Sequence, residues 1–150
     1  MSDAYAKLNG KKVKLIIRNN QAFLKKNGFE QQIPMEEIPL LYREYPQIRY
    51  KNHIFDIETN FFSHRRIEER LFRVVTVNHD DIERFDGFYK VEPGVWCMDI
   101  KMDDIEAYII KRKAVGPFKG MEIEDEIFDE AHVNEWMAEL MDTGVVHYSF

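Results

Sequence analysis

The chain has 150 residues, 45% of them hydrophobic and 13% aromatic, which excludes an intrinsically disordered protein and fits a single domain. Its single cysteine, Cys97, excludes an internal disulfide bond and a zinc site built from several cysteines. The net charge is −6 and no apolar run approaches the roughly 20 residues that span a bilayer, so a cytoplasmic protein with no membrane partner is predicted.

The first third of the chain is predicted to hold one strand and two short helices. Apolar and charged residues alternate over 13–17, which indicates a half-buried strand. Residues 20–26 are expected to form a helix that Asn27-Gly28 ends as a C-cap. Prolines interrupt the next segment and leave room for a helix over 39–45, with Pro39 in its first turn.

The middle of the chain is predicted to be rich in strands. Residues 49–57 and 71–77 have the aromatic and β-branched composition of strands, and a short helix over 63–70 is expected between them. The clearest signal is a β-hairpin over about 88–101. Its second strand, 95–102, alternates an apolar face with a more polar one after a Pro-Gly turn.

The last third of the chain is predicted to be mainly helical. A capping box at Asp103 is expected to begin one helix. A long amphipathic helix is predicted over about 123–141, because its apolar residues recur at helical spacing and Gly144 stops it. Residues 145–150 are expected to form a closing strand. Helices and strands without regular alternation predict a single α+β domain over 1–150, with a mixed or antiparallel sheet.

The predicted hairpin brings two carboxylates and an ammonium group close together. Asp86 precedes its first strand, and Asp99 and Lys101 lie on one face of its second strand. The carboxylates would hold Mg²⁺ and the lysine would orient or activate water for phosphodiester hydrolysis. In the alternative structural interpretation, Asp86-Gly87 is a turn and the other two side chains cover the exposed face of a strand.

A family resemblance supports the catalytic interpretation of these residues. The stretches Phe85-Asp-Gly-Phe-Tyr-Lys-Val91 and Val95-Trp-Cys-Met-Asp-Ile-Lys101 resemble the active-site hairpin of restriction-endonuclease-like nucleases of the PD-(D/E)xK type. The resemblance covers residues 61–113. It implies a Mg²⁺-dependent nuclease, in which Glu69 (or its neighbour Glu68) stands for the family's helical glutamate. The chain departs from the family pattern at Phe85, where a proline is usual.

A cluster of basic residues near two phenylalanines is the second candidate site. Its members are Arg65, Arg66, Arg70 and Arg73. Arginines interleaved with aromatic residues grip phosphates and stack on bases, which makes a nucleic-acid-binding protein a second alternative. The other interpretation is a solvated helix face, and the acidic net charge of the chain favours it.

An acidic segment is the third candidate. Six of the nine residues over 122–130 are Asp or Glu, and at the start of the predicted C-terminal helix they stabilise the helix dipole. The same segment offers a docking surface for a basic partner. The residues expected to bind such a partner are Glu124, Asp125, Asp129 and Glu130.

Charge is distributed unevenly along the chain. Residues 1–75 contain 14 Lys or Arg and 9 Asp or Glu, whereas residues 76–150 contain 7 and 18. In the absence of a strong catalytic signature, opposed basic and acidic patches predict a non-enzymatic protein–protein interaction module. We expect a subunit or accessory factor of a larger assembly, of phage or bacterial type, which binds a protein partner or itself. No cofactor is expected, apart from Mg²⁺ under the nuclease hypothesis.

Overall fold

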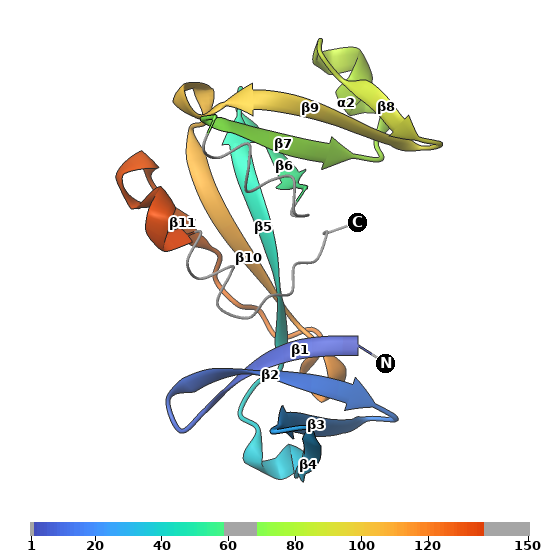
Figure 1. Ribbon diagram of the computed structural model, residues 1–150, viewed down its shortest axis with the longest axis vertical. Coiled ribbons are helices and arrows are strands. Elements are labelled where there is room, and N and C mark those ends of the chain that lie inside the picture. Colours follow the sequence, from blue (N-terminus) through green and yellow to red (C-terminus); the bar gives the residue numbers. More distant parts are fainter. Residues whose placement is uncertain (1, 59–68, 137–150) are drawn as a thin grey trace.

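The computed structural model describes residues 2–58 and 69–136, and its strands form one connected antiparallel sheet (Figure 1). The main path through the sheet has the order β4-β3-β2-β1-β5-β6-β7-β9-β8, while β10 pairs with β5 and carries β11. The strands are β1 (Ser2–Leu8), β2 (Lys11–Arg18), β3 (Gln21–Lys26), β4 (Phe29–Ile33), β5 (Tyr42–Tyr50), β6 (His53–Ile57), β7 (Leu71–Thr76), β8 (Tyr89–Glu92), β9 (Val95–Lys101), β10 (Ala107–Ala114) and β11 (Glu126–Phe128).

The described residues contain little α-helix, so the predicted α+β class is wrong and the fold is mostly antiparallel β-sheet. α2 (His79–Arg84) is a short helix, and the chain is helical again over 133–136. The helix predicted over 63–70 lies outside the described residues except for its last two, which form a turn. Single 3-10 turns are η1 (Met35–Glu37), η2 (Met102–Asp104), η3 (Gly116–Phe118) and η4 (Glu130–His132).

Tight two-residue turns connect the strands of the first half of the chain. Both central residues of each turn have positive φ, the geometry whose twist matches paired antiparallel strands and which Asn and Gly adopt easily. The helix predicted over 20–26 is therefore wrong: the segment is β3, and the residues expected to cap a helix turn the chain into β4. These turns are Asn9-Gly10, Asn19-Asn20, Asn27-Gly28 and Lys51-Asn52.

β5 and β10 form the longest ladder of the structure, with pairs from Tyr42↔Ala114 to Arg49↔Ala107. The helix predicted over 39–45 and the helix predicted from Asp103 are both wrong, because these segments contribute to this ladder. Most side chains of the two strands are buried on both faces, so the residues show no polar–apolar alternation that would identify a strand.

Pro46 lies in the middle of β5, opposite Ile110 of β10. Proline has no N–H to donate and is tolerated in a strand only where one side lacks a neighbour. On the side of β5 away from β10, β1 pairs only at Tyr42 and β6 begins to pair at Gln47. The sheet therefore branches at β5, with β1–β4 as a lower lobe and β6–β9 with α2 as an upper lobe (Figure 1).

The long helix predicted over 123–141 is also wrong in the part that the structure describes. Residues 126–128 add to the edge of β10 as β11, η4 follows, and helix begins only at Val133. Backbone hydrogen bonds offered by β10 override the helical spacing of the apolar residues, since a sheet edge recruits extended chain. Residues 137–141 and the strand expected over 145–150 lie outside the described range.

Other predicted strands are confirmed. β2 covers the alternating segment 13–17, and β7 corresponds to the strand predicted over 71–77. β8 and β9 form the predicted hairpin, with an irregular register near Lys90. The segment 49–57 is extended as predicted, but the Lys51-Asn52 turn divides it between β5 and β6. β2, β7 and β9 were predictable because each buries mainly one face, which leaves a local pattern.

Each lobe has its own buried cluster. In the upper cluster, Trp136 is 1% exposed and packs edge-on against Phe72, with ring centroids 5.6 Å apart. Its indole N–H donates a hydrogen bond to the carbonyl oxygen of Ile109 at 3.1 Å. Trp136 thereby attaches the segment that follows β11 to β10 and to the upper lobe.

Candidate functional site

Asp99 and Lys101 lie on one face of β9, but Asp86 lies on the other side of the sheet. Gly87, next to Asp86, is so close to Met98 that a Cβ added there would lie 3.4 Å from its sulfur. Met98 and Asp99 are consecutive in a strand and project to opposite faces. The structure therefore does not bring the Asp86 and Asp99 carboxylates to one point.

An arginine binds the Asp99 carboxylate. Nε of Arg73 lies 3.1 Å from Asp99 Oδ1, and its Nη1 lies 3.4 Å from Glu58 Oε2. Glu69 is an exposed turn residue just before β7. Within residues 2–58 and 69–136, no group of three or more His, Cys, Asp or Glu side chains is arranged to hold a metal ion. The described geometry therefore gives the nuclease hypothesis no support, and its Mg²⁺ site stays a prediction.

The structure describes two members of the predicted arginine cluster, and both are ion-paired within the chain. The described residues are Arg70 and Arg73, whereas Arg65 and Arg66 lie outside the described range. Nη2 of Arg70 lies 2.7 Å from Asp103 Oδ1 and 3.4 Å from Glu130 Oε1. The hydrogen bond and the charge of Asp103 raise the pKa of Arg70. Neither arginine is left to grip phosphate without competing with carboxylates.

The predicted acidic residues fall in two places. Asp129 and Glu130 belong to the segment that leads to Trp136, where Glu130 binds the arginine described above. Oδ1 of Asp129 accepts a hydrogen bond from the His132 amide at 3.1 Å and lies 2.5 Å from the His132 Nδ1. Glu124 and Asp125, by contrast, are exposed in the loop before β11 and line a groove.

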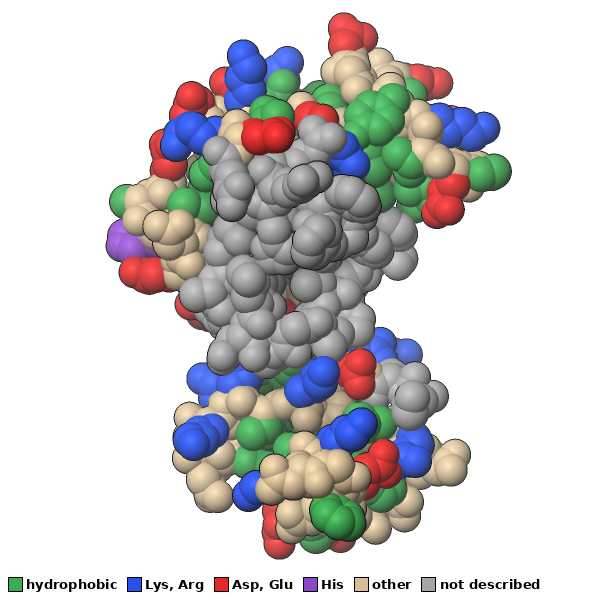
Figure 2. Space-filling view, in the orientation of Figure 1, with side chains coloured by type: hydrophobic (Ala, Val, Ile, Leu, Met, Phe, Trp, Pro, Cys, Tyr) green, Lys and Arg blue, Asp and Glu red, His purple; other side chains and the backbone are tan. Residues whose placement is uncertain are grey.

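The two lobes differ in charge balance, yet both signs are visible on each of them (Figure 2). Residues 2–41, which contain β1–β4, have seven Lys or Arg and four Asp or Glu. Residues 69–106, which contain β7–β9 and α2, have five and ten. The lower lobe is therefore the more basic and the upper lobe the more acidic, but neither is a pole of a single sign.

A groove lies along the outer edge of β10, at the point where β11 separates from it. The β10–β11 ladder ends at the pair Ile110↔Glu126. Beyond that pair, the loop 119–125 and β10 residues 111–114 line an open groove of about 720 Å³. The groove is therefore the place where a two-stranded ribbon opens.

The two lips of this groove carry opposite charge. The cationic lip, on β10, comprises Lys111, Arg112 and Lys113. The acidic lip, on the loop 119–125, comprises Glu122, Glu124 and Asp125 and also carries Lys119. Among the residues that the structure describes, the lysines of one lip and the acids of the other form no ion pair. Met121, 55% exposed, and the half-buried Ile123 add apolar surface to the acidic lip. The lips therefore offer charge of both signs and apolar area to a partner.

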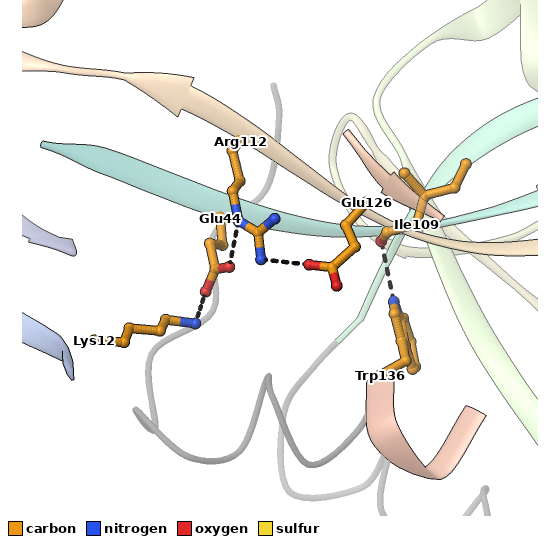
Figure 3. Close-up of polar contacts among 6 residues, drawn as sticks. All are labelled: Lys12, Glu44, Ile109, Arg112, Glu126 and Trp136. Carbon is orange, nitrogen blue, oxygen red and sulfur yellow. Dashed lines mark hydrogen bonds and ion pairs between the residues drawn. The ribbon is translucent and has the colours of Figure 1, made fainter. Parts of the chain in front are cut away.

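A buried carboxylate anchors the cationic lip (Figure 3). Glu44 of β5 is 2% exposed and accepts hydrogen bonds from Lys12 Nζ and, at 2.9 Å, from Arg112 Nε. Nη2 of Arg112 also lies 2.8 Å from Glu126 Oε2. Because an unpaired buried charge is costly, this network fixes β2, β5, β10 and β11 against one another.

A second, smaller groove adjoins the first and shares Arg112 and Ile123 with it. Its volume is about 500 Å³. Apolar side chains from the segment that leads into β5 line it together with Lys7 and Lys12 of the lower lobe. The open surface along β10 thus continues to the junction between the lobes.

Sequence reasoning missed the cationic lip. Lys111 and Lys113 follow an apolar, β-branched run at alternate positions, which is the signal of a strand that emerges from the core. A helix that begins at Asp103 was predicted for these residues, so the strand pattern was not recognised. The density of acidic residues over 122–130 predicts part of the acidic lip, namely Glu124 and Asp125.

A buried polar cluster in the upper lobe was also missed. The carboxylate of Asp81 accepts a hydrogen bond from Thr76 Oγ1 at 2.5 Å and lies 2.9 Å from His53 Nε2. The cluster connects α2 to β7 and to the start of β6. No local pattern relates these three positions, so only the tertiary structure reveals them.

Cys97 is buried, and burial raises the pKa of its thiol to about 11. A thiolate is therefore rare at neutral pH, which disfavours a nucleophilic role.

No known protein family, curated protein or solved structure matches the chain. In the part of the chain that the structure describes, no helix is long and apolar enough to cross a membrane.

Proposed function

We propose that the chain is a non-enzymatic protein-interaction module, a subunit or accessory factor of a larger assembly, which docks through the groove along β10. The observation that supports this proposal is the pair of oppositely charged lips, whose lysines and acids form no ion pairs within the described part of the chain. Charges that do not neutralise each other among the described residues are available to a partner. Complementary charge across an interface gives specificity and fast association.

A polypeptide suits the groove better than a nucleic acid or a small ligand does. The acidic lip repels phosphates, whose neutralisation by cations dominates nucleic-acid affinity. The polar groups are spread along an open strand, whereas a small-molecule site concentrates a few polar groups in an enclosed pocket. Exposed apolar surface at Met121 supplies contact area that charges alone do not provide.

Charge reversal of the cationic lip tests the proposal. The variant K111E/K113E reverses two charges in the groove, and the matched control K25E/K26E makes the same change at exposed residues of β3 in the lower lobe. Tagged wild type and both variants are used to capture proteins from an extract of the cells that make the chain, and recovery is quantified by mass spectrometry. Each candidate partner is then purified and titrated against the three proteins at increasing salt.

We expect a partner that binds wild type and the control equally and the groove variant about tenfold more weakly, as the loss of two or more charge pairs predicts. Its affinity for wild type should fall as salt screens the lips. A set of proteins recovered equally with all three baits would contradict the proposal. A partner lost only with K25E/K26E would place the docking surface on the lower lobe instead.

A further inference from the structure

The geometry points to the way in which the partner binds: an extended acidic segment adds as a strand to the outer edge of β10 at Lys111–Ala114. This inference rests on the proposed function, because it names the occupant of the same groove. It is carried by the backbone pairing of β10, by the spacing of the two lysines and by the rigidity of the strand.

The backbone of β10 is paired unequally along its two edges. β5 pairs with β10 from Ala107 to Ala114, whereas β11 pairs with it only from Tyr108 to Ile110. In the described part of the chain, no strand lies along the outer edge from Lys111 to Ala114. A strand edge of this kind is a template for pairing with another extended segment, whose main chain supplies affinity independently of sequence.

The side chains at this edge select an acidic segment. Lys111 and Lys113 are two residues apart in a strand and therefore project from the same face. The Lys113 ammonium lies 5.4 Å from the centre of the Tyr45 ring, and neither lysine is ion-paired to a described carboxylate. Cross-strand neighbours of opposite charge stabilise a sheet, so glutamates at alternate positions of an added strand match the two lysines.

The edge is preorganised for this pairing. Arg112 projects from the opposite face, where its bonds to Glu44 and Glu126 fix β10 without occupying the lysine face. The amide of Val115 donates to the Leu41 carbonyl at 3.0 Å and ties the end of the strand to the lower lobe. A rigid edge loses little conformational entropy on binding, which favours strand addition.

The chain's own acidic loop shows which register is left open. If the β10–β11 ladder continued past Ile110↔Glu126, Asp125 would lie opposite Lys111. The loop instead separates from β10 and forms the far lip of the groove. A partner strand with acidic side chains would take the position that this loop does not occupy.

Synthetic peptides test the inference directly. The probe is a fluorescein-labelled peptide Thr-Glu-Val-Glu-Val-Glu-Thr, which places three glutamates on one face of an extended strand. One control peptide carries N-methyl groups on alternate residues and cannot complete a strand ladder, and a second replaces each glutamate by lysine. Binding to the full chain is measured by fluorescence anisotropy at low salt for wild type, K111E/K113E and the K25E/K26E control.

We expect wild type and K25E/K26E to bind the glutamate peptide and to bind the N-methylated peptide at least about tenfold more weakly. K111E/K113E should lose the glutamate peptide and prefer the lysine peptide. Equal binding of the N-methylated peptide, or binding unaffected by K111E/K113E, overturns the inference. A concentration-dependent dimer of wild type that is absent in K111E/K113E would also overturn the inference, because a second copy of the chain would then occupy the edge. If the peptides do not bind as expected but the captured partner still requires Lys111 and Lys113, only strand addition is overturned. The proposed function then stands.

Discussion

The guanidinium of Arg70 lies 3.4 Å from the carboxylate of Glu130, so a residue of the predicted basic cluster and one of the predicted acidic segment bind each other. One residue from each of the two patches that were predicted to be opposed thus pairs with the other within the chain. Glu130 belongs to the segment that leads to Trp136, so this ion pair helps to attach that segment to the start of β7. In the groove along β10, by contrast, Lys111 and Lys113 form no described ion pair with the acids of the opposite lip.

Replacement of the buried carboxylate Glu44 by glutamine should destabilise the fold by about 3 kcal/mol, because Lys12 and Arg112 lose their shared counter-charge. Urea unfolding followed by tryptophan fluorescence measures the change. The control E30Q breaks the exposed Arg18–Glu30 pair and should cost less than about 1 kcal/mol. Equal costs for the two variants would contradict the view that the Glu44 network fixes the strands.

Truncation of Trp136 should be among the most damaging single changes. W136A removes a fully buried ring that packs on Phe72 and Tyr108, and an aromatic-to-alanine change of this kind costs about 3–5 kcal/mol. W136F keeps most of the packing and loses the hydrogen bond to the Ile109 carbonyl, so a cost near 1 kcal/mol is expected in addition to a small packing loss. Thermal unfolding followed by circular dichroism separates the two variants, and an unchanged melting temperature for W136A would show that this segment does not stabilise the fold.

Removal of one buried hydroxyl should stabilise the protein. Tyr108 is fully buried, and its hydroxyl has no hydrogen-bond partner among the described residues. Burial raises the pKa of this hydroxyl to about 12, which agrees with its poor solvation. Y108F deletes the unsatisfied group with little change of shape and should raise the free energy of unfolding by up to about 1 kcal/mol. A loss of stability in urea titration would mean that the hydroxyl has a partner.

The thiol of Cys97 should react slowly in the native state. Its pKa of about 11, against an ordinary value of 9.0, lowers the thiolate fraction about a hundredfold at neutral pH, and burial slows the reaction further. Labelling with a chromogenic disulfide reagent should therefore be fast only in denaturant. The exposed thiol of K90C in a C97A background gives the rate for an accessible cysteine on β8, and native Cys97 reacting as fast as that control would contradict the burial.

His132 should titrate above its ordinary pKa of 6.5, because the hydrogen bond and the charge of Asp129 favour the protonated ring. Since the folded-state pKa is raised, the pair stabilises the fold fully below the ordinary value, and this contribution is lost as pH rises through the folded-state pKa. NMR of the ring protons follows the titration. D129N should lower the midpoint of the His132 titration. D125N removes an acid in the loop before β11 that is not bonded to the ring, and it should leave the midpoint nearly unchanged.

Part of the candidate site was accessible from the sequence and part was not. Glu124 and Asp125 stand out because acidic residues are dense around them, and composition is a local property. Lys111 and Lys113 lie at the end of β10, a buried strand whose residues show no amphipathic pattern. Their position opposite the acids could therefore not be inferred from the sequence. For Asp86, Asp99 and Lys101 the hairpin was predicted correctly, but the predicted site was not. In the structure, Asp86 lies on the opposite side of the sheet from Asp99.

By itself, the sequence determined the segments whose pattern is local: β2, β7 and β9 alternate because each buries mainly one face. It also determined that the chain builds an apolar core without disulfide bonds. Only the tertiary structure decided that β5, β10 and β11 are strands. A strand that is buried on both faces, or that pairs through its backbone with a distant segment, leaves no periodicity in its own residues. The groove depends on those strands and on where one ladder ends, which is why no reading of neighbouring residues could locate it.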